Sequence, residues 1–194
     1  MDRYISIPDA ASCMRLVEEC VEIGVAGENW EQHLASGMAQ RVGGDLGLYV
    51  SSKMNGGTPD LSTWTFAKGT DSTLQELFAA YRTAGGLQLL PELPIVGPRA
   101  LRDGEVTYRQ SELVSRRDYH ASELYQRYMA PGQLEDFLSS VIIQADGTVL
   151  GLSIHRCHGQ AGFTERDEAV AALLVLLLSN RRPCALGPDA ARNL

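Results

Sequence analysis

The residues best suited to chemistry form one short cluster, residues 155–158, which read His-Arg-Cys-His. Neutral imidazoles and a thiolate are ligands that zinc accepts, but a structural zinc site needs four ligands. The remaining histidines, His33 and His120, belong to distant segments, and no two of the four cysteines have the CxxC spacing. We therefore predict neither a metal site nor a bound cofactor.

A thiol-dependent reductase is one function that stays open for Cys157. A redox role would require Cys13, Cys20 or Cys184 to approach Cys157 in the folded chain. The dinucleotide-binding, P-loop and zinc-protease patterns GxGxxG, GxxxxGK and HExxH do not occur in the sequence. The cluster alone does not identify an enzyme, and we assign no catalytic residue.

A β-hairpin should carry this cluster at its end. Two runs rich in aliphatic and β-branched residues, 138–144 and 149–156, flank Asp146-Gly147, which is a strong hairpin signal. If Asp146 and Gly147 are the two central residues of a type I′ turn, one hairpin face is apolar and the other is mixed. The apolar face would hold Val141, Ile143, Leu150, Leu152 and Ile154, and the mixed face Ser140, Ile142, Gly151, Ser153 and His155.

Periodicity and capping residues predict the elements around the hairpin. Asp9, Asn29 and Thr164 are expected to cap helices, and Asp167 completes a capping box with Thr164. Residues 86–115 contain three prolines and little periodicity, so we predict an irregular connection there. Helices are expected at 9–25, 30–42, 72–84, 118–129 and 165–181, and strands at 46–51, 61–67 and 105–108 besides the hairpin. This order indicates an α+β fold with a mostly antiparallel sheet.

Three stretches together resemble a known family of sensor domains. Residues 123–131 read Glu-Leu-Tyr-Gln-Arg-Tyr-Met-Ala-Pro, the hairpin ends Gly-Leu-Ser-Ile-His-Arg at 151–156, and Phe-Thr-Glu-Arg-Asp at 163–167 opens an apolar helix. This order is similar to the GAF-like domain that precedes the DNA-binding helix-turn-helix of LuxR-type regulators. The resemblance implies a GAF/PAS-like fold in which the N- and C-terminal helices pack on one face of the sheet. It also implies a small-molecule effector, whose identity the sequence does not supply.

We expect one sensor domain at residues 1–182 and a tail or linker stub at 183–194. The helix-turn-helix that the family carries is not found after residue 182, so we expect either the sensor part of a longer regulator or a stand-alone form whose DNA binding is absent or delegated. A net charge of −7 also argues against a direct nucleic-acid surface, because phosphate contacts need clustered Lys and Arg. The N-terminus lacks a signal-peptide pattern, and the longest apolar run is far shorter than the roughly 20 residues that span a bilayer. We therefore expect a cytoplasmic protein without membrane contact.

A ligand pocket is expected over the mixed face of the hairpin. Ligand sites are mostly apolar with a few placed polar groups, and the mixed face fits that description. The segment from Gly85 to Tyr128 has the length and irregularity of a lid above it. The predicted ligand-binding residues are Tyr49, Trp64, Phe66, Tyr125, Tyr128, Ser140, Ile142, Gly151, Ser153 and His155.

A homodimer is expected through the first and last helices. The first helix has an apolar arc wider than one sheet contact needs, and residues 169–178 are apolar on nearly every side. One domain could not bury both surfaces alone. Besides sensing and the reductase, a ligand-free dimerisation module stays open. A cavity of several hundred cubic ångströms on the mixed hairpin face would support sensing. Two sulfur atoms in bonding reach would favour the enzyme, and a filled sheet face would favour the dimerisation module.

Overall fold

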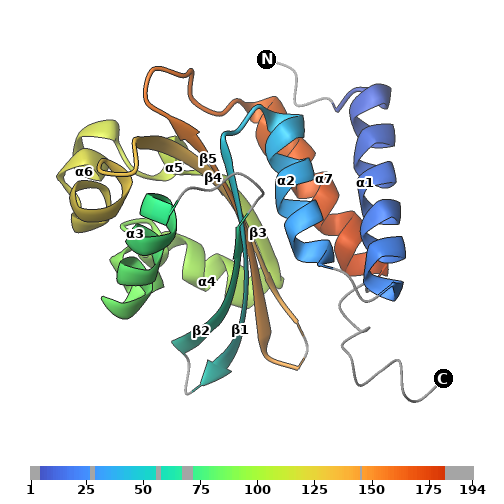
Figure 1. The fold of residues 1–194 in the computed structure, drawn as a ribbon, viewed down its shortest axis with the longest axis horizontal. Coiled ribbons are helices and arrows are strands. Elements are labelled where there is room, and N and C mark those ends of the chain that lie inside the picture. The colour runs from blue at the N-terminus through green and yellow to red at the C-terminus, as the bar shows by residue number, and fades with distance from the viewer. Residues whose placement is uncertain (1–4, 27–28, 56–57, 67–71, 145, 182–194) are drawn as a thin grey trace.

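A single antiparallel sheet with helices on both faces forms the fold (Figure 1). The structure is a computed structural model that describes residues 5–26, 29–55, 58–66, 72–144 and 146–181. Helices α1, α2 and α7 cover one face of the sheet, and α3, α4 and α6 cover the other (Figure 1). This arrangement confirms the predicted α+β, GAF/PAS-like class, with the N- and C-terminal helices packed on one face. The predicted tail at 183–194 lies outside the described residues.

The sheet has the strand order β2-β1-β5-β4-β3, and every neighbouring pair is antiparallel. Both predicted hairpins are present, because β1 pairs with β2 and β4 pairs with β5. The strands are β1 (Leu46–Asn55), β2 (Thr58–Phe66), β3 (Glu105–Arg109), β4 (Leu134–Ile143) and β5 (Thr148–Cys157).

Three helices form the layer on the first face: α1 (Ile7–Val25), α2 (Trp30–Val42) and α7 (Glu165–Arg181). Asn29 caps α2 as predicted, and Gly43 ends it in the left-handed conformation. The capping box of α7 is also confirmed, because the Thr164 amide donates to Asp167 Oδ2 and the Asp167 amide donates to Thr164 Oγ1. The predicted cap of α1 is wrong by three residues: Ser6 is the cap and accepts from the amide of Asp9.

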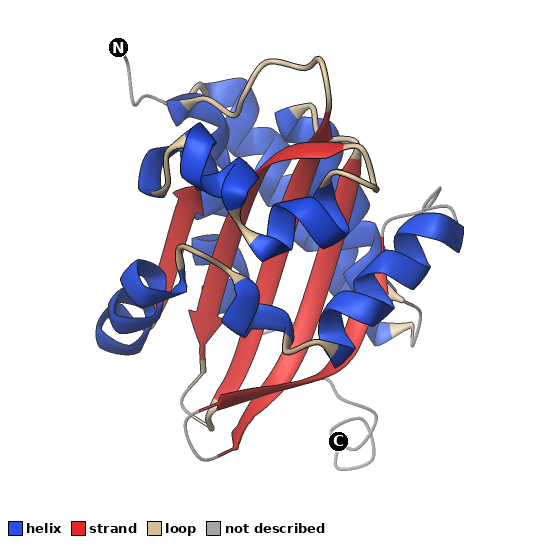
Figure 2. Cartoon of the chain, turned by 90° about the vertical axis from the view of Figure 1, so that its left-hand side faces the viewer, coloured by secondary structure: helices blue, strands red, loops and turns tan. Residues whose placement is uncertain are grey.

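The second face is covered by shorter elements, which cross the front of the sheet in Figure 2. They are α3 (Ser72–Thr83), the 3-10 turn η1 (Gly86–Leu89), α4 (Leu93–Asp103), α5 (Gln110–Leu113), α6 (Arg116–Ala121) and the π-helical turn η2 (Tyr125–Met129). The predicted irregular connection at 86–115 is therefore wrong, although its short strand is confirmed as β3. The predicted helix at 118–129 is divided, because α6 ends before the extended Ser122.

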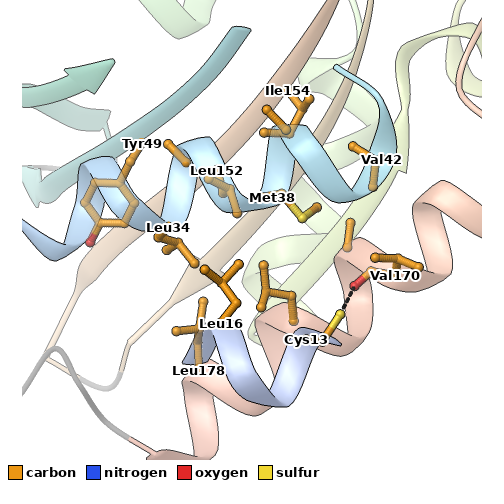
Figure 3. Packing of buried hydrophobic residues seen from close by; sticks show 14 of the residues in the cluster. Cys13, Leu16, Leu34, Met38, Val42, Tyr49, Leu152, Ile154, Val170 and Leu178 are labelled. Carbon is orange, nitrogen blue, oxygen red and sulfur yellow. Dashed lines mark hydrogen bonds between the residues drawn. The ribbon is translucent and has the colours of Figure 1, made fainter. Parts of the chain in front are cut away.

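Apolar side chains form one cluster on each face of the sheet. The first lies between the sheet and α1, α2 and α7, where Leu16, Leu34, Leu152 and Val170 converge (Figure 3). The second lies under α3, α4 and η2 and is rich in aromatic rings, among them Tyr81, Tyr108, Tyr119, Tyr128 and Phe137. Two separate cores therefore share one sheet.

The register of the β4–β5 hairpin differs from the prediction by one residue. Ile142 lies opposite Leu150 and Val141 opposite Gly151, because Gln144 pairs with Thr148 around a three-residue loop. Gly147 is left-handed, with a φ of 79°, as the last residue of such a loop requires. The slip moves Ser140 and Ile142 to the face that carries Leu150, Leu152 and Ile154. The predicted mixed face therefore does not exist as one surface.

The apolar surface of α7 is largely buried within the chain. Val170, Leu174 and Leu178 belong to the core under the sheet, and α1 packs along α7. Cys13 on α1 donates to the Val170 carbonyl at 3.8 Å, and Arg166 on α7 donates to Asp9 on α1. The assumption that one domain could not bury both surfaces is therefore wrong. Within the described ranges, no helix has the length and hydrophobicity to cross a membrane.

Candidate functional site

A cavity of about 460 Å³ lies between the sheet and helices α2 and α7. Its size falls within the range of small-molecule sites, roughly 300 to 1,000 Å³. Strands β1, β4 and β5 form its floor and the two helices form its roof; Figure 3 shows Tyr49, Leu34, Leu152 and Leu178 in this region. The lining residues are Trp30, Leu34, Tyr49, Ser140, Ile142, Ile143, Gln144, Asp146, Leu150, Gly151, Leu152, Val175, Leu178 and Ser179.

The walls of the cavity are mainly apolar and one end is polar. Trp30 packs edge-on against Tyr49, with ring centroids 5.4 Å apart, and both rings line the cavity between α2 and β1. The hydroxyl of Ser140 already bonds to Thr107 Oγ1 at 2.9 Å, and Ser179 donates to the Val175 carbonyl. Gln144 and Asp146 lie at the hairpin turn, where Asp146 is exposed. A bound molecule would therefore place an apolar body inside and its polar groups near the turn.

The structure brings four of the predicted ligand-binding residues to this cavity, namely Tyr49, Ser140, Ile142 and Gly151. Gly151 contributes only its backbone, because a Cβ atom there would point to the other face and meet Val50 at 3.7 Å. The other predicted residues do not join them. Ser153, His155, Tyr125 and Tyr128 lie on the side of the sheet with the aromatic core, and the side chains of Trp64 and Phe66 lie outside the described residues.

The cavity also has residues that sequence reasoning missed. Trp30, Leu34, Val175, Leu178 and Ser179 come from α2 and α7. In the sequence, the apolar residues among them look like ordinary helix residues of a hydrophobic core, and Ser179 has no distinguishing pattern. The three-residue hairpin loop would have been the useful signal, because it places Ile142 beside Leu150 and directs both under α7.

His155 is buried in the aromatic core on the opposite face. Its Nε2 atom lies 3.1 Å from Ser153 Oγ, and its ring packs against Phe78 and Phe137. Nδ1 has no hydrogen-bond partner among the described atoms. Burial lowers the pKa of His155 to about 4, so the imidazole is neutral at physiological pH. A neutral, enclosed imidazole of this kind contributes to packing and is not accessible from the surface.

The remaining residues of the His-Arg-Cys-His cluster have separate structural roles. His158 Nδ1 bonds to Glu135 at 3.0 Å, and the same carboxylate accepts from His120 and Tyr125. The backbone amide of Cys157 donates to Asp45. Arg156 donates to backbone carbonyl groups after α2 and before α7. The cluster therefore connects elements and does not converge on one reaction centre.

The described thiols are poorly suited to redox chemistry. Cys13 and Cys20 lie in the core under α1, whereas Cys157 packs against the aromatic core across the sheet, and all three are free. Burial raises the pKa of Cys20 to about 12 and also raises the pKa values of Cys13 and Cys157, which disfavours the reactive thiolate. Among the residues that the structure describes, no three His, Cys, Asp or Glu side chains could hold a metal ion. Cys184 lies outside them.

Comparison with known proteins identifies the fold. No family model and no curated protein matches the sequence. The structure resembles the ligand-binding domain of VqsR from Pseudomonas aeruginosa, with a TM-score of 0.59 and 17% identity over 88% of this chain and 93% of that one. It also resembles CepR2 of Burkholderia cenocepacia, described as an N-acylhomoserine lactone dependent LuxR family transcription factor (TM-score 0.52, 12% identity, 87% and 94% covered).

Escherichia coli SdiA is a third similar structure, with a TM-score of 0.50 and 12% identity over 86% of this chain and 67% of that one. At such low identities these likenesses establish the fold alone. The chain has the fold of the ligand-binding domains of LuxR-type regulators, as the resemblance in the sequence implied.

Proposed function

We propose that this chain is a small-molecule-sensing regulatory domain of a transcriptional regulator, and that its effector occupies the cavity beneath α2 and α7. The cavity is the observation that carries the proposal, since its volume of about 460 Å³ and its apolar walls suit a small organic molecule. The shared fold supports it, because the similar domains belong to regulators. Binding there would couple the sheet to α7 through Val175 and Leu178.

An amphipathic effector fits this cavity best. CepR2 is described as dependent on an N-acylhomoserine lactone, which joins an acyl chain to a polar head. In this chain the aliphatic walls, such as Leu34, Leu150 and Leu152, would receive an apolar chain. Gln144 and Asp146 at the turn would lie near the polar head. We propose this general class of ligand.

Two measurements test the proposal. Native mass spectrometry of the purified protein should detect a co-purifying small molecule as added mass. After removal of that molecule, titration with the neutral fluorophore N-phenyl-1-naphthylamine should give saturable fluorescence, because an apolar probe gains from entering an apolar cavity. A protein that carries no added mass and gives no saturable signal would contradict the proposed function.

We extend the proposal to a homodimer through α1 and α7. Although most of the apolar surface of these helices is buried within the chain, Met14 on α1 is 45% exposed and Leu176 on α7 is 48% exposed. Leu176→Glu should dissociate the dimer, because burying an unpaired carboxylate at an interface is costly. Analytical ultracentrifugation at micromolar concentration would measure the change.

Leu101→Glu is the matched control for this prediction. Leu101 is 66% exposed on α4, which covers the other face of the sheet, so the same charge there should leave the dimer intact. A wild-type protein that sediments as a monomer would refute the homodimer, and equal dissociation by both variants would refute an interface through α1 and α7.

A further inference from the structure

Helix α4 and the turn before it form a cover over the aromatic core. Residues 85–104 contain η1 and α4, and α4 packs on β3 and β4 at the edge of the sheet. In Figure 2 the helices on this side cross the front of the sheet. Within α4, Val96 and Ala100 are buried, whereas Ile95 and Leu101 are exposed to solvent. The segment thus has one face in contact with the core and one in solvent.

Glycines in the left-handed conformation border the cover at both ends. Gly85 has a φ of 116°, Gly86 a φ of 51° and Gly104 a φ of 78°. Glycine reaches these conformations at little cost, and such residues absorb backbone rotation at the ends of moving segments. The Gly104 carbonyl accepts from the Ile143 amide at 2.7 Å, so the segment is anchored to β4 at that end. Backbone rotation at these glycines would move the segment as a unit.

Beneath the cover, Glu92 places a carboxyl group in an apolar environment. Its exposed fraction is 0%, and its Oε2 atom has no hydrogen-bond partner among the described atoms. The carboxylate accepts a long bond of 3.5 Å from the Tyr108 hydroxyl to Oε1 and a bond from the backbone amide of Glu92 itself. A buried carboxylate with one oxygen left without a partner and no cation beside it is costly, whereas a neutral carboxyl group at the same place is tolerated far better.

The titratable groups near Glu92 are phenols. Tyr108 on β3, Tyr81 on α3 and Tyr119 on α6 each interact electrostatically with it, and burial raises the pKa of all three. Arg99 and Arg102 of α4 itself are exposed. No cation is among the groups that influence Glu92 in the described part of the chain. The backbone amide of Glu92 and the Tyr108 hydroxyl lower the pKa of Glu92, but burial outweighs both while the cover is closed.

From this geometry we infer that residues 85–104 are a lid that is closed over the aromatic core only while Glu92 is protonated, and that ionisation of Glu92 releases it. This device lies across the sheet from the proposed effector cavity and is independent of it. Opening would uncover His155 and the aromatic side chains of that core. The domain would therefore respond to pH on one face and to its effector on the other.

Burial raises the pKa of Glu92 from 4.5 to about 7, which sets the pH range of the device. Because the closed state binds the proton more tightly than the open state, closure is fully favoured below pH 4.5 and weakens as pH rises towards 7. The opening equilibrium should increase roughly tenfold per pH unit in this interval, by about 300-fold in all, and stay constant above it.

Hydrogen exchange measured by mass spectrometry from pH 5 to pH 8 tests the inference. After correction for intrinsic exchange rates, amides of α4 should open more often as pH rises, with a plateau above pH 7. Amides of α2 serve as the internal reference and should not follow this curve. Equal pH dependence in α4 and α2 would overturn the inference, because it would reflect loss of global stability.

Two substitutions separate Glu92 from other carboxyl groups. Glu92→Gln is neutral and nearly isosteric, so α4 should stay closed and lose its pH dependence. Glu105→Gln, at an exposed position beside the lid, removes the same charge and should behave like the wild type. If Glu92→Gln fails to fold, Tyr108→Phe gives the second test: loss of the hydroxyl that bonds Glu92 should move the opening step to higher pH. An unmoved step, or a pH dependence that survives Glu92→Gln, would refute the lid.

Discussion

Replacing Arg156 with methionine should lower the free energy of unfolding by about 3 kcal/mol, because five oxygen acceptors lose a charged donor. The guanidinium donates to Gly43 at 3.1 Å, Ala161 at 2.9 Å and Gly162 at 2.8 Å, and also to the Val42 carbonyl. It also pairs with the buried carboxylate of Asp167 at 3.2 Å and lies 4.1 Å from the Phe163 ring centroid. One side chain thus joins the end of α2 to the beginning of α7.

Chemical denaturation followed by circular dichroism measures this effect. Arg156→Lys should lose most of the same stability, since an ammonium group cannot reproduce the planar set of five donors. Arg15→Met is the matched control, because Arg15 is exposed on α1 and its loss should change stability by less than about 0.5 kcal/mol. Equal denaturation midpoints for Arg15→Met and Arg156→Met would show that these contacts contribute little.

The sequence shows plainly that residues 155–158 carry side chains capable of chemistry. It does not show the structural contacts that these side chains make. Arg156 is satisfied by carbonyl groups of Gly43 and Ala161, which carry no side-chain signal in a sequence. His158 and His120 both reach Glu135 only because the end of β5, the last turn of α6 and the start of β4 lie together. Contacts of this kind depend on tertiary structure, and local spacing does not reveal them.

The hairpin shows how a correct local prediction can misplace a site. Gly147 has the left-handed φ that both a two-residue and a three-residue loop require, so its presence does not choose between them. Strand β4 is buried on both faces, with Phe137 on one side and Leu138 on the other, so its apolar pattern does not fix the register either. A one-residue difference then assigns Ser140 and Ile142 to the opposite surface.

The proline-rich segment failed as a prediction for a different reason. Pro94 occupies the first turn of α4, where a missing amide hydrogen costs nothing. Pro98 removes one internal hydrogen bond, but Gly104 ends the helix in the left-handed conformation and the Glu92 carbonyl accepts from Ile95 and Val96. Burial of Val96 and Ala100 then stabilises a helix whose intrinsic propensity is poor. By contrast, α2 was predictable because its cap and its periodicity agree, and α7 because a capping box precedes a long apolar run.

Filling the cavity should abolish effector binding. Ile142 and Leu150 are direct neighbours across β4 and β5, and both line the cavity. The double variant Ile142→Trp, Leu150→Phe would occupy space between the sheet and α7 that a ligand needs. We expect affinity for N-phenyl-1-naphthylamine to fall at least 100-fold, which corresponds to about 2.7 kcal/mol. Overpacking costs about 1 to 3 kcal/mol where space is short, so thermal denaturation should accompany the titration.

Val141→Phe is the matched control, because it enlarges a neighbouring residue of the same strand on the opposite face. Its partner across the strands is Gly151, which has no side chain to obstruct the new ring. The control should bind the probe like the wild type. If instead Val141→Phe abolishes binding and the double variant does not, the effector occupies the face with the aromatic core, where the sequence placed it. If both variants bind normally, the probe site lies outside the sheet altogether, and the cavity beneath α2 and α7 is not the sensor site.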